Sequence, residues 1–212
     1  MSYRWHGSEE LWVRVGAHHP QQILIIEPLF EEKNRTRRLI ADVMRGLDRL
    51  QIGSTLPDLP GTGESLTEIA EFSFEDWKEA IAAANLAIAP TITVSLRGGA
   101  LLDFGAQHAW RFAPETGARI VRDLKRSQLA SAATAPLFAG HALSSQFLVE
   151  LEAATPPTHA NLRTVRLNSD AAEADAKLAG TPLWRRAEPG DDPELAAAMV
   201  ADIAWWMSQC AA

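Results

Sequence analysis

The chain has 212 residues, of which 47% are hydrophobic and 22% charged, and its formal net charge is −7. A chain of this length and composition can bury one substantial core, so we expect a single domain over residues 1–212. The acidic balance argues against nucleic acid and anionic membrane surfaces as partners, since both need a concentrated basic face. No apolar run is long enough to span a membrane and residues 1–10 lack a signal-peptide pattern, which predicts a cytoplasmic protein. The single cysteine, Cys210, excludes an internal disulfide.

The first half of the chain alternates predicted strands with predicted helices. Short runs of alternating or continuous apolar residues indicate strands, and apolar residues at helical spacing indicate helices. Ser73 and Asp76 form a capping-box pattern at the start of the second helix. These patterns predict, in chain order, a strand at 11–15, a strand at 23–26, a helix at about 31–51, a strand at 52–57, a helix at about 73–85 and a strand at 91–95. The order predicts an α/β fold with a doubly wound, mostly parallel sheet.

The second half changes rhythm after a predicted strand at 109–114. Two amphipathic helices are predicted at 117–130 and 143–154, and an insertion of this kind commonly covers the carboxyl ends of the strands, where ligands bind. We therefore expect a helical cap insertion at about 115–160. Further along the chain, the patterns predict strands at 163–167 and 181–185 and a closing helix at 193–207.

Residues 91–105 combine a buried strand with a tight turn, the arrangement in which many α/β enzymes present a reactive atom. The strand leads into Gly98 and Gly99, and the residues after them are predicted to begin a helix. In the pattern G-x-S-x-G, small residues flank a serine at a strained turn. The window Ser95–Gly99 keeps both small flanking residues, but its centre is Arg97. The pattern predicts that the turn is retained and that its nucleophile is not.

Ser95, two positions before that centre, is the alternative nucleophile. Taking it as the reactive serine places Thr93 and Arg97 in the flanking positions, where bulk clashes with the turn. The competing interpretation is structural: a small residue that lets the strand and the next segment approach. His108 and His141 are the two histidines that we expect to approach the cleft from elsewhere, unless each is simply packed or solvated.

The sequence predicts neither a cofactor nor a metal site. His18 and His19 are adjacent, so their side chains point apart on an extended segment, and no carboxylate cluster lies beside them in the sequence. The glycine-containing loop at 58–65 lacks the phosphate-binding pattern G-x-x-x-x-G-K-[ST]. We attribute the seven tryptophans to core and lid packing rather than to a ligand cage.

Several stretches together resemble a known family. They are residues 26–38, which read IEPLFEEKNRTRR, residues 58–65, which read DLPGTGES, and residues 96–102, which read LRGGALL, with further likeness at 139–144 and 180–184. In order and spacing they are similar to blocks of α/β-hydrolases. More narrowly they resemble the second type of exosortase A system-associated hydrolases, which are encoded beside bacterial exopolysaccharide and protein-sorting loci. Those proteins also tend to carry an arginine where the nucleophile would stand.

The resemblance implies a place for each part of a serine-hydrolase site. The acid is expected after the strand that follows the cap, where Asp170 stands, and the histidine after the last strand, where residues 184–189 contain none. The oxyanion donors are expected among backbone N–H groups near Leu29 and Phe30 and at Gly98. Covalent acyl transfer needs the serine and its base together, so the usual serine-hydrolase route is not expected.

The first functional hypothesis is a catalytically degenerate hydrolase, or pseudoenzyme, that acts as a binding or accessory protein, in exopolysaccharide production as the resemblance implies. Its ligand is a small acidic or acyl molecule, and the residues expected to bind it are Arg97, Gly98, Leu29, Phe30 and Glu31. A guanidinium at the turn suits a carboxylate or phosphate. The competing interpretation is that an internal carboxylate holds this guanidinium, with four candidates: Glu27, Glu31, Glu32 and Asp58.

The second hypothesis is an active esterase or thioesterase. It uses Ser95 as the nucleophile and Asp170 as the acid, together with a relocated histidine. A third possibility is an interaction module that binds a protein partner or forms a homo-oligomer.

Overall fold

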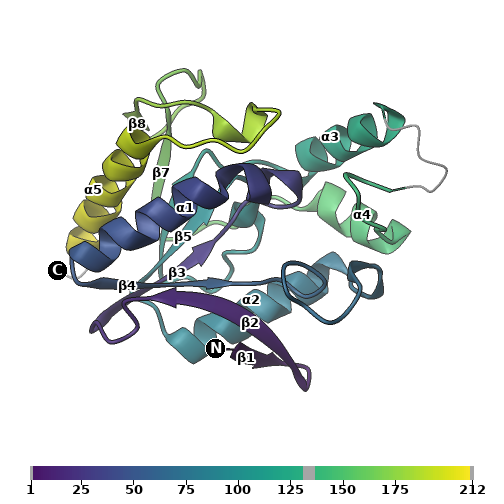
Figure 1. Ribbon diagram of the computed structural model, residues 1–212, viewed down its shortest axis with the longest axis horizontal. Coiled ribbons are helices and arrows are strands. Elements are labelled where there is room, and N and C mark those ends of the chain that lie inside the picture. The colour runs from purple at the N-terminus through teal and green to yellow at the C-terminus, as the bar shows by residue number, and fades with distance from the viewer. Residues whose placement is uncertain (1, 131–136, 211–212) are drawn as a thin grey trace.

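The structure, a computed structural model, describes residues 2–130 and 137–210 (Figure 1). Within these residues eight strands form one sheet in the order β1-β2-β4-β3-β5-β6-β7-β8. The first two strands form an antiparallel hairpin, β2 also runs antiparallel to β4, and all later neighbours are parallel. The doubly wound, mostly parallel sheet is therefore confirmed. The strands are β1 (Ser2–Trp5), β2 (Ser8–Val15), β3 (Gln21–Ile26), β4 (Ile52–Pro57), β5 (Ile92–Leu96), β6 (His108–Phe112), β7 (Asn161–Leu167) and β8 (Ala176–Leu178).

Helices cover both faces of this sheet. Successive side chains of β3 point to opposite faces of the sheet, and helices cover both faces. The apolar run of β3 is therefore continuous. Ile23 and Ile25 pack in the core with α1 and α5, whereas Leu24 and Ile26 pack in the core with α2, α3 and α4. None of the described helices is long and apolar enough to cross a membrane. The helices are α1 (Glu31–Arg49), α2 (Phe74–Ile88), α3 (Gly117–Ala130), α4 (Ser145–Ala153) and α5 (Pro193–Cys210).

Most predicted elements lie within a few residues of their observed bounds, and the capping box of Ser73 and Asp76 is present. The helix expected after Gly99 is wrong: the chain forms only a short 3-10 helix, Arg97–Leu101. The chain turns back because β6 begins soon afterwards and because the carboxylate of Asp103 is fixed by hydrogen bonds from two strands.

The strand expected at 181–185 is also wrong, because residues Leu183–Arg185 form a 3-10 helix. Pro182, which precedes them, has no N–H to donate to a sheet. The free edge of β7 is already occupied by β8, which pairs with residues 165–167. The sheet therefore ends before this segment, which instead turns over the carboxyl ends of the strands.

Gly99 marks a close approach between the turn after β5 and the end of β3. A Cβ atom at this position would lie 2.5 Å from the carbonyl oxygen of Glu27 and 2.6 Å from that of Ile26. Both oxygens belong to the backbone of the central part of the sheet, so no side-chain movement relieves the contact. The glycine is required by this approach.

We expect Gly99→Ala to lower the free energy of unfolding by about 3 kcal/mol, the upper end of the usual cost of overpacking. Urea unfolding followed by circular dichroism measures the change. Gly105→Ala is the matched control, because nothing lies within 4 Å of a Cβ there and only its φ of +78° is unfavourable, which costs about 1 kcal/mol. If Gly99→Ala is no more costly than this control, the turn does not pack on β3 as described.

Candidate functional site

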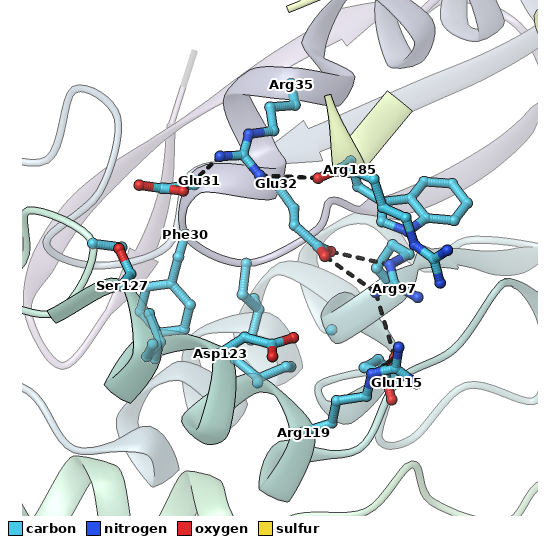
Figure 2. Close-up of a pocket in the computed structure, with 16 residues that line it drawn as sticks. Phe30, Glu31, Glu32, Arg35, Arg97, Glu115, Arg119, Asp123, Ser127 and Arg185 are labelled. Carbon is cyan, nitrogen blue, oxygen red and sulfur yellow. Dashed lines mark hydrogen bonds and ion pairs between the residues drawn. The ribbon is translucent and has the colours of Figure 1, made fainter. Parts of the chain in front are cut away.

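A cavity of about 330 Å³ lies at the carboxyl ends of the parallel strands (Figure 2). Its walls come from the loop after β3, the turn after β5, helix α3 and the 3-10 helix at Leu183–Arg185. The sheet brings the first two together because β3 and β5 are parallel neighbours. The five residues predicted to bind a ligand all line this cavity: Leu29, Phe30, Glu31, Arg97 and Gly98.

The segments expected to supply oxyanion donors meet in this cavity. A Cβ atom at Gly98 would lie 2.7 Å from Cδ1 of Ile120 and 3.0 Å from Cγ of Leu29, so both side chains close on the Gly98 backbone. Phe30, at the start of α1, has a positive φ of 57°. This part of the wall therefore consists of the Gly98 backbone packed against the side chains of Leu29 and Ile120.

Arg97 is the residue at the bend that follows β5. Its φ of 52° lies in the left-handed region, which is uncommon for a residue with a Cβ atom and marks a sharp local turn. Ser95 before it and Gly99 after it are small and buried. The strand and turn therefore have the shape expected of a nucleophile-bearing turn, with a guanidinium side chain at the apex.

The Arg97 guanidinium is held within the protein, and the residue is only 8% exposed. Its Nε and Nη2 donate to the two carboxylate oxygens of Glu32, both at 3.1 Å, and Nη1 donates to the carbonyl oxygen of Ala113 at 3.1 Å. A carboxylate oxygen of Glu115 lies 3.4 Å from Nη2, and the guanidinium carbon lies 4.7 Å from the ring centroid of Trp184. Figure 2 shows the two glutamates on either side of the arginine. A bidentate pair of this kind uses most of the arginine's donors.

Internal carboxylates therefore hold Arg97, as one of the two interpretations predicted, but the set of residues differs. Glu32 is the only one of the four candidates that does so among the residues described here. Glu115 was not predicted, because it comes from the loop after β6 and only the strand order brings it to the turn. Because both carboxylates occupy this guanidinium, it is not free to bind an anionic ligand.

The other candidate carboxylates have partners of their own. Glu31 pairs with Arg35 at 2.7 Å, and Lys33 pairs with Glu27 at 2.7 Å and with Asp58 at 3.1 Å. Burial raises the pKa of Glu27, although the Lys33 ammonium acts in the opposite direction. These pairs tie the start of α1 to the ends of β3 and β4.

The fold that carries this cavity is similar to those of known proteins. No protein-family model matches the chain, and no curated protein matches it. Among solved structures, Est1E from Butyrivibrio proteoclasticus, with ferulic acid bound, is 14% identical and matches over 99% of each chain with a TM-score of 0.69. A thermophilic esterase from Thermogutta terrifontis is 11% identical and matches over 99% of this chain and 98% of its own, with a TM-score of 0.65. The chain has the α/β-hydrolase fold.

A mammalian protein shows the same likeness. Alpha/beta hydrolase domain-containing protein 10 from mouse is 13% identical and covers 99% of this chain and 98% of its own, with a TM-score of 0.65. Identities this low establish the fold and leave the chemistry to the site itself.

Within the α/β-hydrolase fold, Ser95 is placed below the turn and outside the cavity. It is fully buried, and its hydroxyl donates to Oδ2 of Asp103 at 2.9 Å. Asp103 also accepts two hydrogen bonds of 2.8 Å from Arg111 and lies 3.0 Å from Nε2 of His159. The group contains a serine, a carboxylate and a histidine, but the carboxylate stands between the other two. Acyl transfer needs the histidine beside the serine.

The Asp103 carboxylate is the centre of this buried cluster. Burial by itself would raise its pKa, but the hydrogen bonds from Arg111, His159 and Ser95 outweigh burial and leave the pKa below its ordinary range. The carboxylate therefore stays charged and balances the Arg111 guanidinium. This arrangement joins β5, β6 and the segment before β7.

Asp170 follows β7, where the resemblance places the acid of an α/β-hydrolase. Its Oδ2 accepts a 2.7 Å hydrogen bond from Arg166, and its Oδ1 accepts one of 3.0 Å from the backbone N–H of Ala172. The Ala172 hydrogen bond and then the Arg166 guanidinium lower the pKa of Asp170 despite partial burial. Asp170 lines a second cavity of about 360 Å³ that Arg97 also lines. The structure thus brings Asp170 and Arg97 to one cavity and leaves Ser95 out of it.

Histidines are absent from the described residues that line these two cavities. His141 contacts only the wall: its ring lies 5.8 Å from that of Phe30, and burial lowers its pKa. His108 begins β6, so it lies at the opposite end of the strands. After β8, where a hydrolase histidine is expected, the cavity is lined by Trp184 and Arg185.

Helix α3 contributes residues that were not among the five predicted to bind a ligand. Ile120 and Leu124 present apolar surface to the first cavity, and Arg119 and Asp123 present charge. The helix lies within the insertion at 115–160 that was expected to form a cap. Its amphipathic pattern was the available signal, but periodicity alone does not separate a face that covers a cavity from one that covers a core.

Asp103→Asn is expected to lower the free energy of unfolding at neutral pH by about 3–5 kcal/mol, because it leaves the buried Arg111 guanidinium without a charge partner. The folded-state pKa of Asp103 is lowered, so its contribution is present above the unfolded pKa of about 3.9 and is lost as the pH falls through the folded-state pKa. The difference in the free energy of unfolding between the wild type and Asp103→Asn therefore becomes smaller as the pH falls.

Denaturant unfolding at a series of pH values measures this dependence. The matched control is Asp123→Asn, since Asp123 forms an exposed pair with Arg126 and exposed pairs contribute about 1 kcal/mol or less. A constant difference between Asp103→Asn and the wild type across the acid range would contradict the proposed charge balance.

Proposed function

We propose that this chain is a binding or accessory protein of the α/β-hydrolase fold that holds a small acidic or acyl ligand and does not carry out Ser-His-Asp acyl transfer. The observation that carries the proposal is the residue at the apex of the turn. Arg97 stands where the hydroxyl of a hydrolase would project, and Glu32 and Glu115 hold its guanidinium. A guanidinium in this state is neither a nucleophile nor a base.

The cavity supports ligand binding. Its volume of about 330 Å³ falls in the range of small-molecule sites, which begins at about 300 Å³. The apolar side chains of Leu29, Phe30, Ile120 and Leu124 line it beside the Gly98 backbone. Apolar walls with a few fixed polar groups are typical of sites that bind and orient an organic molecule.

The alternative, an esterase or thioesterase that uses Ser95 and Asp170, has less support. The Ser95 hydroxyl is buried and donates to Asp103, so it has neither access to a substrate nor a histidine beside it. Asp170 lines a different space, where Arg166 is its partner.

The resemblance to exosortase-associated hydrolases supports a role in bacterial exopolysaccharide production. Arginine at the centre of the turn is one of the features in which this chain resembles that family, whose members tend to carry an arginine there. A ligand-holding protein without acyl transfer fits an accessory position in such a system.

We expect that a fluorophosphonate probe does not label the purified protein and that short-chain 4-nitrophenyl esters are not hydrolysed above the buffer rate, because labelling needs an activated nucleophile. In-gel fluorescence and absorbance assays measure both, with an active serine esterase as positive control. Labelling that Ser95→Ala abolishes would establish the esterase alternative. Labelling that survives Ser95→Ala would reveal another nucleophile and equally overturn the proposal.

Deletion of the gene in the bacterium that encodes this chain is expected to lower the yield of exopolysaccharide. Complementation with Ser95→Ala is expected to restore the yield, because the proposed role needs no serine nucleophile. Quantified extracellular polysaccharide is the measurement, and complementation with the unaltered gene is the control. An unchanged yield after deletion would remove this chain from exopolysaccharide production.

A further inference from the structure

The second cavity, beside Asp170, has no role in the function proposed so far. We infer that it binds the anionic head, a carboxylate or phosphate, of an amphipathic ligand whose apolar part lies in the first cavity, and that Arg185 is the residue that recognises the head. This inference rests on the proposed function and specifies the ligand that the site takes.

The two cavities adjoin each other across one wall. Five residues line both: Arg97, Glu115, Arg119, Trp184 and Arg185. The ion pairs of Arg97 and of Arg119 with Glu115 cross this wall and fix it between the two spaces. A ligand that reaches past these residues therefore contacts both cavities at once.

Away from the wall that it shares with the second cavity, the first cavity suits the apolar part of the ligand because the charged side chains there have partners. Glu31 pairs with Arg35, and Glu32 pairs with Arg97. What remains along the wall is the apolar surface given by the loop after β3 and by α3. An ionic head placed there would lose its water without gaining a free partner.

The second cavity carries an excess of positive charge in a chain whose net charge is −7. Its lining includes four arginines and two carboxylates, and Glu32 offsets one more charge because it pairs with Arg97, so the balance is 4 − 3, an excess of one positive charge: Arg97, Arg119, Arg166 and Arg185 against Glu115, Asp170 and Glu32. An acidic protein that gathers arginines around one hollow provides a favourable local potential for an anion.

Arg185 is the arginine of this set that is exposed and, among the described residues, forms no ion pair, whereas the one donor of Arg166 without a partner there, Nε, is buried. Arg97 and Arg119 share Glu115, and Arg166 pairs with Asp170. Across the described ranges 2–130 and 137–210, Arg185 forms no ion pair and its side chain is exposed. Its planar guanidinium can bind a carboxylate or phosphate with two parallel hydrogen bonds.

The backbone that carries Arg185 is held in place. The carbonyl oxygen of the preceding residue, Trp184, accepts a 3.0 Å hydrogen bond from Arg35, and the Trp184 ring lies over the Arg97 guanidinium. Figure 2 shows Arg185 near Arg35 and Arg97. Arg185 also lines both cavities, so a head bound to it leaves the tail directed along the shared wall.

Isothermal titration calorimetry on the full chain tests the inference with four probes: octanoate, octyl phosphate, octanol and acetate. The first three share an apolar chain and differ in the charge of the head, and acetate keeps the charge without the chain. We expect octanoate or octyl phosphate to bind more tightly than octanol by about tenfold, the effect of charge-assisted hydrogen bonds. Acetate is expected to bind at least about tenfold more weakly than octanoate, because its apolar chain is missing.

Arg185→Gln is expected to remove the advantage of the anionic probes over octanol and to leave octanol binding unchanged. The matched control is Arg186→Gln, the next residue, which is exposed and lines neither cavity. It should bind all four probes as the wild type does. Both variants change an exposed side chain, so unfolding does not confound the comparison.

The outcomes separate the inference from the proposed function. Octanol binding with no preference for an anion, or an anion preference that survives Arg185→Gln, overturns the inference and leaves a ligand-binding cavity. If none of the four probes binds, both the inference and the ligand-binding part of the proposed function fail. An equal loss of affinity for the anionic probes in Arg185→Gln and Arg186→Gln would show a general effect of surface charge. That result would also overturn the inference.

Discussion

The bidentate ion pair between Arg97 and Glu32 is the interaction on which the cavity depends. It joins the turn after β5 to the first turn of α1, where the helix dipole also favours a carboxylate. The Arg97 side chain is 10% exposed and that of Glu32 is 29% exposed, so the loss of Glu32 would leave the more buried charge of the pair without its main partner. The apex of the turn is therefore a structural junction and the cavity is shaped around a neutralised charge.

The same turn illustrates how a fold and its chemistry separate. The chain shares the α/β-hydrolase fold with esterases to which it is only 11–14% identical. At the bend after β5 it carries Arg97, whose guanidinium is held by Glu32 and Glu115. Function has to be inferred from the side chains at the site, because the frame accommodates many chemistries.

Local patterns were sufficient for much of the fold. The continuous apolar run of β3, the capping box at Ser73 and the amphipathic stripe of α1 each follow from residues within a few positions of one another. The two wrong elements lie where partners distant in sequence decide the outcome. Asp103 ends the turn early through contacts with Arg111 and His159, and β8 takes the sheet edge that was expected to receive residues 181–185.

The sequence likewise predicted part of the site. The resemblance to α/β-hydrolases placed Leu29, Phe30 and Gly98 together, the turn pattern added Arg97, and Glu31 was a candidate partner of that arginine. All five line one cavity. Glu115 and Trp184, which complete the environment of Arg97, come from loops after β6 and β8, and no local signal pairs them with the turn. The alternation along β5, by contrast, does indicate where Ser95 points. Its side chain lies on the same face of the sheet as those of Leu24 and Ile26.

The wall between the two cavities has a thermodynamic consequence. Arg97 and Glu115 belong to both spaces, so a molecule that shifts either side chain in one compartment changes the shape and charge of the other. Binding in the two compartments would then be coupled, and such coupling acts equally in both directions. A ligand that displaced the Arg97–Glu115 pair from one side would thus change the affinity on the other side.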